Sequence, residues 1–202
     1  MPNRTVNDRG KSSTLFKFGF SALLIMTIVF LMNGCARWPD GGGGEENKLL
    51  IIRVDLNENG QLNTELGKYY IVFDTKEEAS KPPSWDREEW EGGYYYIMLD
   101  YMGFCFGKWD STCLHTSIGV TDDNYFQVNL DLDSLGNPEK IFMNVITTDY
   151  NDTTYDYINN SSDLTIDTSL SNFNKIVQDF PLDSDGGLDF DIIKVTISLV
   201  MS

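Results

Sequence analysis

The chain has 202 residues, a length that suits one domain with its own hydrophobic core once the N-terminal segment is set aside. Residues 1–34 carry four of the 15 basic residues and one of the 31 acidic residues, so the rest of the chain has a net charge of −19. A domain this acidic repels nucleic-acid phosphates and anionic lipid surfaces, so no nucleic-acid partner is expected. Aromatic residues make up 13% of the chain, and this content argues against disorder because such side chains bury large areas.

The first 34 residues have the composition of a signal peptide. Residues 1–17 are polar with a net charge of +3, and residues 18–32, FGFSALLIMTIVFLM, carry no charge. A basic region followed by such an apolar run predicts a secretory signal. The run has about 15 residues where a membrane-spanning helix needs roughly 20, which disfavours the alternative of an uncleaved, single-pass N-terminal signal anchor.

The apolar run ends in the sequence LMNGC, residues 31–35, which resembles the lipobox of bacterial lipoproteins. Gly34 and Cys35 match that motif, Met32 is an acceptable apolar substitute, and Asn33 departs from it. The resemblance implies cleavage before Cys35, lipidation of its sulfur, and an extracytoplasmic protein anchored to the cell membrane or the outer membrane. Residues 35–47 include four consecutive glycines and are predicted to be a flexible tether.

From Lys48 onward, apolar and polar residues alternate with a period of two, the pattern of strands that bury one face. In chain order, the expected strands are residues 48–56, 67–75, 94–101, 125–132, 141–148 and 193–199. Turns rich in Gly, Asn and Asp separate them, and no stretch with a helical period exceeds about two turns. Residues 48–202 are therefore predicted to form an all-β domain, a single antiparallel β-sandwich of about eight to ten strands.

Residues 55–63, DLNENGQLN, lie between the first two predicted strands. Asp55, Asn57, Asn59 and Gly60 imitate the start of a calcium-binding EF-hand loop. However, Leu66 stands where that loop needs a glutamate, and strands replace its flanking helices. We interpret the segment as a hairpin turn, with a partial Ca²⁺ site as the alternative.

Tryptophan and proline are concentrated in residues 81–93, KPPSWDREEWEGG. Trp85, Trp90, Tyr94 and Trp109 are the candidate ligand-binding residues, because exposed aromatic faces can stack on sugar rings. The alternative is that this loop folds its tryptophans onto the sandwich as a lid.

Two cysteines remain once Cys35 is assigned to lipidation. Cys105 and Cys113 flank a turn at residues 107–111, on the two arms of a predicted hairpin. Outside the cytoplasm such a pair is expected to form a disulfide. The alternative is two buried thiols on neighbouring strands, and two cysteines with one histidine are too few for a zinc site.

Several segments together resemble the DOMON domains and the family-nine carbohydrate-binding modules. They are YYIVFDT (69–75), the tryptophan-rich loop that follows, YYYIMLDY (94–101) and YFQVNLDLDSLGNPEKIFMNVITTD (125–149). The resemblance implies a jelly-roll or DOMON-like sandwich, and a domain that binds sugars or, in some members, haem. His115 is the only histidine and lies in a predicted strand, so we expect it to be structural rather than a haem ligand or a catalytic residue.

One acidic turn is a candidate for a structural Ca²⁺. Asp183, Asp185 and Asp189 surround Gly186 and Gly187, and their carboxylates could donate oxygen ligands to this hard cation. The alternative is that the turn is simply solvated, and no other cofactor is expected.

No motif in the chain indicates a reaction. A Gly-x-Ser-x-Gly elbow, a P-loop and a dinucleotide fingerprint are all absent from the sequence. We therefore expect no catalytic residues and a membrane-anchored, non-enzymatic binding or accessory protein, with carbohydrate as the first expected ligand. The alternative is a structural or assembly component of the cell envelope that binds another protein.

Overall fold

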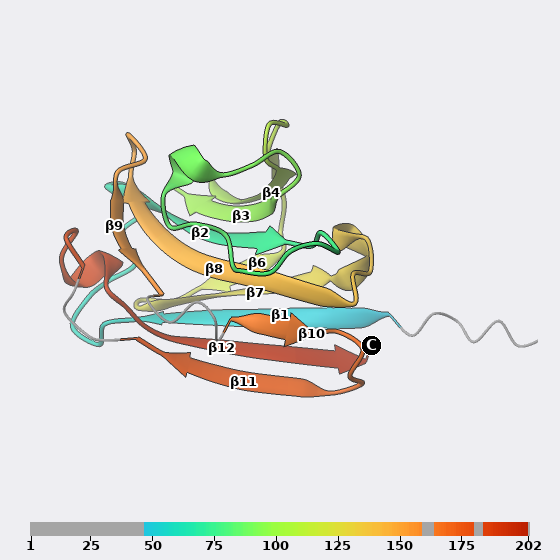
Figure 1. Cartoon of the computed structure of the whole chain (residues 1–202). Coiled ribbons are helices and arrows are strands. Elements are labelled where there is room, and N and C mark those ends of the chain that lie inside the picture. The colour runs from blue at the N-terminus through green and yellow to red at the C-terminus, as the bar shows by residue number, and fades with distance from the viewer. Residues whose placement is uncertain (1–46, 159–163, 180–183, 202) are drawn as a thin grey trace, which may run out of the picture. The chain divides into compact units, whose positions relative to one another are not determined.

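The computed structural model describes residues 47–158, 164–179 and 184–201. Twelve strands lie within these residues and form two antiparallel sheets packed as layers (Figure 1). The all-β sandwich predicted from the two-residue alternation is therefore confirmed.

Sheet A has the strand order β11-β12-β1-β7-β6. Its strands are β11 (Phe173–Gln178), β12 (Ile192–Met201), β1 (Lys48–Leu56), β7 (Tyr125–Asp131) and β6 (Gly119–Thr121). β1 is central: its start pairs with the end of β12, Lys48 opposite Met201, and Leu49 lies opposite Asp131 of β7. The first and last strands of the domain therefore lie side by side in the middle of this sheet.

Sheet B has the order β10-β8-β2-β3-β4-β5, and β9 pairs with β8 outside that path. Its strands are β10 (Thr165–Asp167), β8 (Lys140–Asp149), β2 (Gly67–Asp74), β3 (Tyr95–Asp100), β4 (Gly103–Lys108), β5 (Leu114–His115) and β9 (Thr154–Tyr157). Three short 3₁₀ helices are also described: η1 (Arg87–Glu89), η2 (Leu132–Leu135) and η4 (Leu188–Phe190).

The core lies between the two sheets and is built from every second residue of their strands. In β7 and β1 the inward side chains are buried: Phe126, Val128, Leu130, Leu50, Ile52, Val54 and Leu56. Burial of each such side chain stabilises the fold by about 1.5–3 kcal/mol relative to exposure. β8 differs because it is buried on both faces from Ile141 to Thr148, as expected for a strand whose outer face is also covered.

The segment between β1 and β2 is not a hairpin turn, so that prediction is wrong. β1 belongs to sheet A and β2 to sheet B, and residues 57–66 cross from one sheet to the other. Asn57 shapes the crossing: its Oδ1 accepts the Asn59 amide at 3.1 Å, and its Nδ2 donates to Asp191 at 2.7 Å. A Cβ at Gly60 would overlap the carbonyl oxygen of Leu188, so only glycine fits there.

The described residues contain more strands than the eight to ten expected from the sequence. β6, β9 and β10 have only three, four and three residues, which is too short for a period of two to be visible. β6 and β10 lie where the chain passes from one sheet to the other: β5 of sheet B leads into β6 of sheet A, and β10 of sheet B leads into β11 of sheet A. The chain therefore joins the two layers along both of their long edges.

Candidate functional site

The outer face of sheet B is covered by residues 75–94, here called the lid segment. A second apolar cluster lies there, formed by Tyr70, Val72, Trp90, Tyr96, Cys105 and Ile146. Trp90 comes from the lid segment and is only 6% exposed. Its ring meets Tyr70 edge-on with the centroids 5.5 Å apart, and its Nε1 donates to the carbonyl of Ser84 at 2.8 Å. Trp90 is therefore a packing residue of the lid segment rather than an exposed stacking face.

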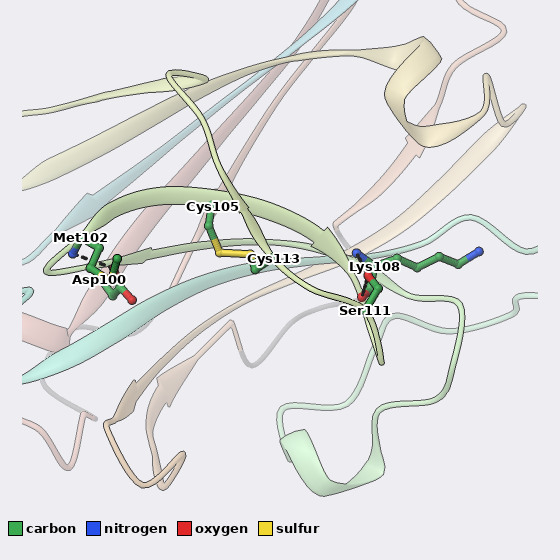
Figure 2. Close-up of a disulfide and its surroundings, with 6 residues drawn as sticks. All are labelled: Asp100, Met102, Cys105, Lys108, Ser111 and Cys113. Carbon is green, nitrogen blue, oxygen red and sulfur yellow. Dashed lines mark hydrogen bonds between the residues drawn. A yellow bond between two sulfur atoms is a disulfide. The ribbon is translucent and has the colours of Figure 1, made fainter.

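A disulfide between Cys105 and Cys113 closes the β4–β5 hairpin next to this cluster (Figure 2). The two Cα atoms lie 5.7 Å apart, and Cys105 is fully buried. At the hairpin tip, the Lys108 amide donates to the Ser111 hydroxyl at 3.1 Å, while the Ser111 amide donates back to the Lys108 carbonyl at 2.9 Å. Trp109 lies within the nine-residue ring that the disulfide closes, and its amide donates to the Tyr94 carbonyl at 2.7 Å.

Trp109 connects the disulfide loop to the lid segment. Its ring lies 5.2 Å from Trp90 and 6.2 Å from Tyr96, edge-on to both. Edge-to-face pairs of this kind contribute about 0.5–1.5 kcal/mol beyond the area they bury. The disulfide loop and the lid segment therefore stabilise each other.

Arg87 fixes the lid segment by charge as well as by packing. Its guanidinium carbon lies 5.1 Å from the ring centre of Tyr70, 5.0 Å from Trp109 and 5.9 Å from Trp90. Its Nη1 also forms an ion pair with the carboxylate of Asp152. A cation over an aromatic face contributes about 0.5–2 kcal/mol, more where water is excluded.

Asp152 is the acidic centre of this arrangement. Besides Arg87, its Oδ1 contacts Lys68 Nζ at 2.8 Å and the Tyr70 hydroxyl at 3.4 Å. Burial raises the pKa of Tyr70 and the cation of Arg87 only partly offsets this, so the hydroxyl keeps its proton and can donate it. Asp152 has a φ of +65°, a left-handed backbone that costs a non-glycine residue roughly 1–2 kcal/mol.

The β8–β9 turn holds Asp152 in that conformation. Asp149 Oδ1 accepts the amides of Asn151 and Thr153, each at 2.8 Å. Burial alone would raise the pKa of Asp149, but these hydrogen bonds outweigh it and the pKa is lowered. The ionised Asp149 carboxylate therefore organises the turn that presents Asp152.

One tryptophan of the lid segment faces water. Trp85 is 47% exposed and stacks on Tyr157 of β9, with the centroids 5.3 Å apart and the planes 20° apart. The Thr154 hydroxyl donates to the Trp85 carbonyl at 3.1 Å and so attaches the lid segment to β9. We call Trp85 and Tyr157 the aromatic platform.

A second pair of exposed aromatic rings lies at the same end of sheet B. Tyr101 and Tyr150 have ring centres 6.0 Å apart, and the Tyr150 hydroxyl donates to the Thr64 carbonyl at 2.6 Å. Lys68 Nζ lies 5.4 Å from the Tyr150 ring centre, and the same amine reaches Asp152. This lysine therefore lies between the second aromatic pair and Asp152, which Arg87 links to the lid segment.

The structure separates the four predicted ligand-binding residues. Trp90 and Trp109 pack together in the cluster, and Tyr94 is half-buried against it, with Lys76 Nζ 5.0 Å from its ring centre. Only Trp85 presents much of its surface to water.

Several residues of this site, among them Arg87, Asp152 and Tyr157, were not among the sequence predictions. Arg87 could have been suspected, because it lies between Trp85 and Trp90 in the sequence and arginine often stacks on indole rings. Asp152 and Tyr157 are more than sixty residues further along the chain, and no local pattern marks either of them.

The residues of the EF-hand-like segment are engaged in other contacts. Asp55 pairs with Arg53 at 2.7 Å and with Lys194 at 3.2 Å. Asn57 and Asn59 form the crossing between the sheets described above. The segment therefore serves to connect the two layers.

Of the three aspartates predicted as a Ca²⁺ site, Asp183 lies outside the described residues. Asp189 accepts hydrogen bonds from the Gln61 amide at 2.9 Å and from Asn63 Nδ2 at 3.0 Å, while Asp185 uses its amide to bond the Tyr155 carbonyl at 2.9 Å. Over residues 47–158, 164–179 and 184–201, no group of three or more His, Cys, Asp or Glu side chains is placed to hold a metal ion.

The remaining predictions concern His115 and the N-terminal region. His115 is exposed on β5, opposite Cys105 in the ladder. Cys35 and the signal residues 1–34 lie outside the described residues, as does the tether except for Asn47. In the part of the chain that the structure describes, no helix has the length and apolar character to cross a membrane.

In comparisons with known proteins, no family model, curated protein or solved structure matches the chain. The resemblance to the DOMON and family-nine carbohydrate-binding group therefore rests on the sequence segments alone and stays a prediction.

Proposed function

We propose that the chain is a non-enzymatic, lipid-anchored binding protein whose β-sandwich holds a saccharide against the aromatic platform. The observation that supports this is the exposed indole of Trp85, supported on one side by Tyr157. A fixed, flat aromatic surface is the usual partner of the C–H face of a sugar ring, while charged side chains nearby can bond its hydroxyl groups. Arg87, two residues from Trp85, and the Asp152 carboxylate with which it pairs are the charged groups in this proposal.

The rigidity of the lid segment favours binding at this position. Trp90 anchors the segment in the apolar cluster, Arg87 joins it to Asp152, and Thr154 bonds the Trp85 backbone itself. Binding to a surface that is already ordered avoids the cost of about 0.5–1.5 kcal/mol for immobilising each mobile side chain.

The disulfide supports the extracytoplasmic part of the proposal, because disulfides persist in oxidising compartments and are rare in the cytosol. Mass spectrometry of the mature N-terminus tests the anchor directly. We expect a diacylglycerol on Cys35 as the first residue. An unmodified peptide that includes residues 1–34 would show that the chain keeps its signal segment and has no lipid anchor.

Saccharide binding is tested by isothermal titration of the full chain in a detergent without a sugar headgroup. The probes are soluble oligomers of glucose, xylose, mannose and N-acetylglucosamine. We expect one of them to bind, and Trp85→Ala to weaken that binding roughly tenfold or more, since tenfold corresponds to about 1.4 kcal/mol.

The matched control is Leu114→Ala, which removes an exposed apolar side chain of sheet B on β5, away from the platform. It should leave the affinity unchanged. If wild-type protein binds none of the four oligomers, or if Trp85→Ala binds as tightly as wild type, the proposal is wrong.

A further inference from the structure

Four exposed apolar or aromatic side chains lie together at one end of sheet B. Leu66 precedes β2, Tyr101 and Met102 follow β3, and Tyr150 follows β8. Because β2 is the antiparallel neighbour of both β3 and β8, all four residues lie at the same end of the sheet. Leu66, Tyr101 and Met102 are 63%, 66% and 59% exposed, and Tyr150 is 37% exposed. We call this group the apolar end.

The two tyrosines of the apolar end are held by the backbone around them. The Tyr150 hydroxyl donates to the Thr64 carbonyl at 2.6 Å and accepts the Tyr101 amide at 3.4 Å. The two ring centres lie 6.0 Å apart, and Lys68 Nζ lies 5.4 Å from the ring centre of Tyr150. A ligand that stacks here therefore meets a ring that is already ordered, which lowers the entropy cost of binding.

A row of charged groups joins the apolar end to the aromatic platform. Lys68 lies beside Tyr150 and pairs with Asp152 at 2.8 Å, and Asp152 pairs with Arg87, two residues from Trp85. Among the described residues, every hydrogen bond and ion pair of the Asp152 carboxylate uses Oδ1. The Asp152 side chain is 37% exposed, so Oδ2 can accept a hydrogen bond from a ligand.

The separation of the two aromatic surfaces sets the length of a ligand that contacts both. Tyr157, which supports Trp85, lies opposite Ile146 in the β8–β9 ladder, and Tyr150 is four residues after Ile146, just past the end of β8. Four residues of a strand span about 13 Å, which is more than one sugar ring covers. A single sugar can therefore contact only one of the two surfaces, whereas a chain of several rings can reach both.

We propose that the saccharide held at the aromatic platform is a chain, bound along its length from the platform to Tyr150 and Tyr101. This inference rests on the proposed function and adds that the ligand is a polysaccharide segment rather than a single sugar. The aromatic rings at each end stack on sugar faces, and Asp152 between them accepts from a hydroxyl group. Two weak contacts joined by one chain reinforce each other, because the second forms at a high effective concentration.

Isothermal titration of the full chain with oligomers of the best-binding sugar, from one ring to six, tests this inference. We expect the six-ring oligomer to bind roughly tenfold or more tightly than the two-ring oligomer. Tyr101→Ala should remove most of this gain and leave the affinity for two rings unchanged, because two rings occupy the platform alone. Leu114→Ala removes an exposed apolar side chain on β5 and should change neither affinity.

Thermal melts check that the fold is kept, and Met102→Ala replaces Tyr101→Ala if that variant melts well below the wild type. Equal affinities for two and six rings, both lost in Trp85→Ala, overturn this inference and leave the proposed function standing. A gain with length that Tyr101→Ala does not reduce also overturns it, and assigns the apolar end to another partner, such as a protein or a lipid surface. A wild type that binds none of the oligomers overturns both proposals.

Discussion

Both outer faces of this sandwich are formed by every second residue of their strands, but one face is covered by the lid segment and the other is open. On sheet B, the outward residues Tyr70, Val72 and Tyr96 are large and apolar, and the lid segment buries them. On sheet A the outward residues mix aliphatic side chains such as Ile51 and Val200 with polar ones such as Thr196, and they stay half-buried or exposed.

The difference shows that the covering of a sheet is encoded in the strands themselves as well as in the loop that supplies the cover. The large apolar side chains on the outer face of sheet B give the tryptophans of the lid segment a surface to pack against, whereas aliphatic and polar side chains alternate on the outer face of sheet A and no described segment covers them. The covered face should therefore be sensitive to substitution and the open face tolerant.

The largest effect is expected from Trp90→Ala. Removing this buried ring leaves a cavity between Tyr70 and Trp109 and should cost about 3–5 kcal/mol of unfolding free energy. Ile51→Ala, on the open face, should cost about 1 kcal/mol or less because its side chain is already half-exposed. Urea unfolding of both variants measures the comparison, and equal losses would mean that the lid segment does not pack as described.

The second effect concerns the disulfide beside the covered face. Replacing Cys105 and Cys113 by serine together should lower the unfolding free energy by about 2–3 kcal/mol, because a ring of this size no longer restricts the unfolded chain. Calorimetric melting measures it. An unchanged melting temperature would show that the hairpin hydrogen bonds and Trp109 packing suffice to hold the loop.

A smaller and more local effect is expected for Arg87→Ala. The variant loses its contacts with the aromatic rings and with Asp152, while Lys68 still pairs with that carboxylate, so we expect a loss of about 1–2 kcal/mol. Limited proteolysis should cut the lid segment faster than in wild type. Arg87→Lys keeps the charge without the planar group, so its cleavage rate should lie between those of the wild type and Arg87→Ala. Cleavage of Arg87→Ala at the wild-type rate would contradict the anchoring role.

The smallest effect depends on pH. The pKa of Asp149 is lowered in the folded protein from its ordinary value of 3.8, so its contribution to stability is present above that value and is lost as the pH falls through the lowered pKa. The amides of Asn151 and Thr153 should therefore lose protection from hydrogen exchange in acid before the amides of β1 do. In Asp149→Asn this loss of protection in acid should no longer occur. If it persists, a group other than Asp149 causes it.

The long strands were predictable because their burial is a property of neighbouring residues. Phe126, Val128 and Leu130 alternate with polar residues and are buried as expected, and the six long segments all became strands. The connection after β1 was not predictable, because Asn57 and Gly60 specify a change of direction but not which sheet the next strand joins.

The candidate site was predictable only in part. The composition of the lid segment marked its tryptophans as candidates, but it could not show which of them faces water. Trp90 is buried because it packs on Tyr70, whereas Trp85 stacks on Tyr157 and stays exposed. Such contacts join residues far apart in the sequence, and a local pattern carries no information about them.

The central position of β1 has a mechanical consequence. The described chain enters sheet A at Lys48, whereas the aromatic platform lies toward the other end of the sandwich, where Thr154 at the start of β9 bonds Trp85. If the chain is anchored through the residues before Lys48 and holds a ligand at the platform, as we propose, tension between the two would pull β1 along its own axis. The strand is flanked by β12 and β7 over almost its whole length, so that load falls on both hydrogen-bonded ladders in shear, and many bonds must break together before the strand slides out.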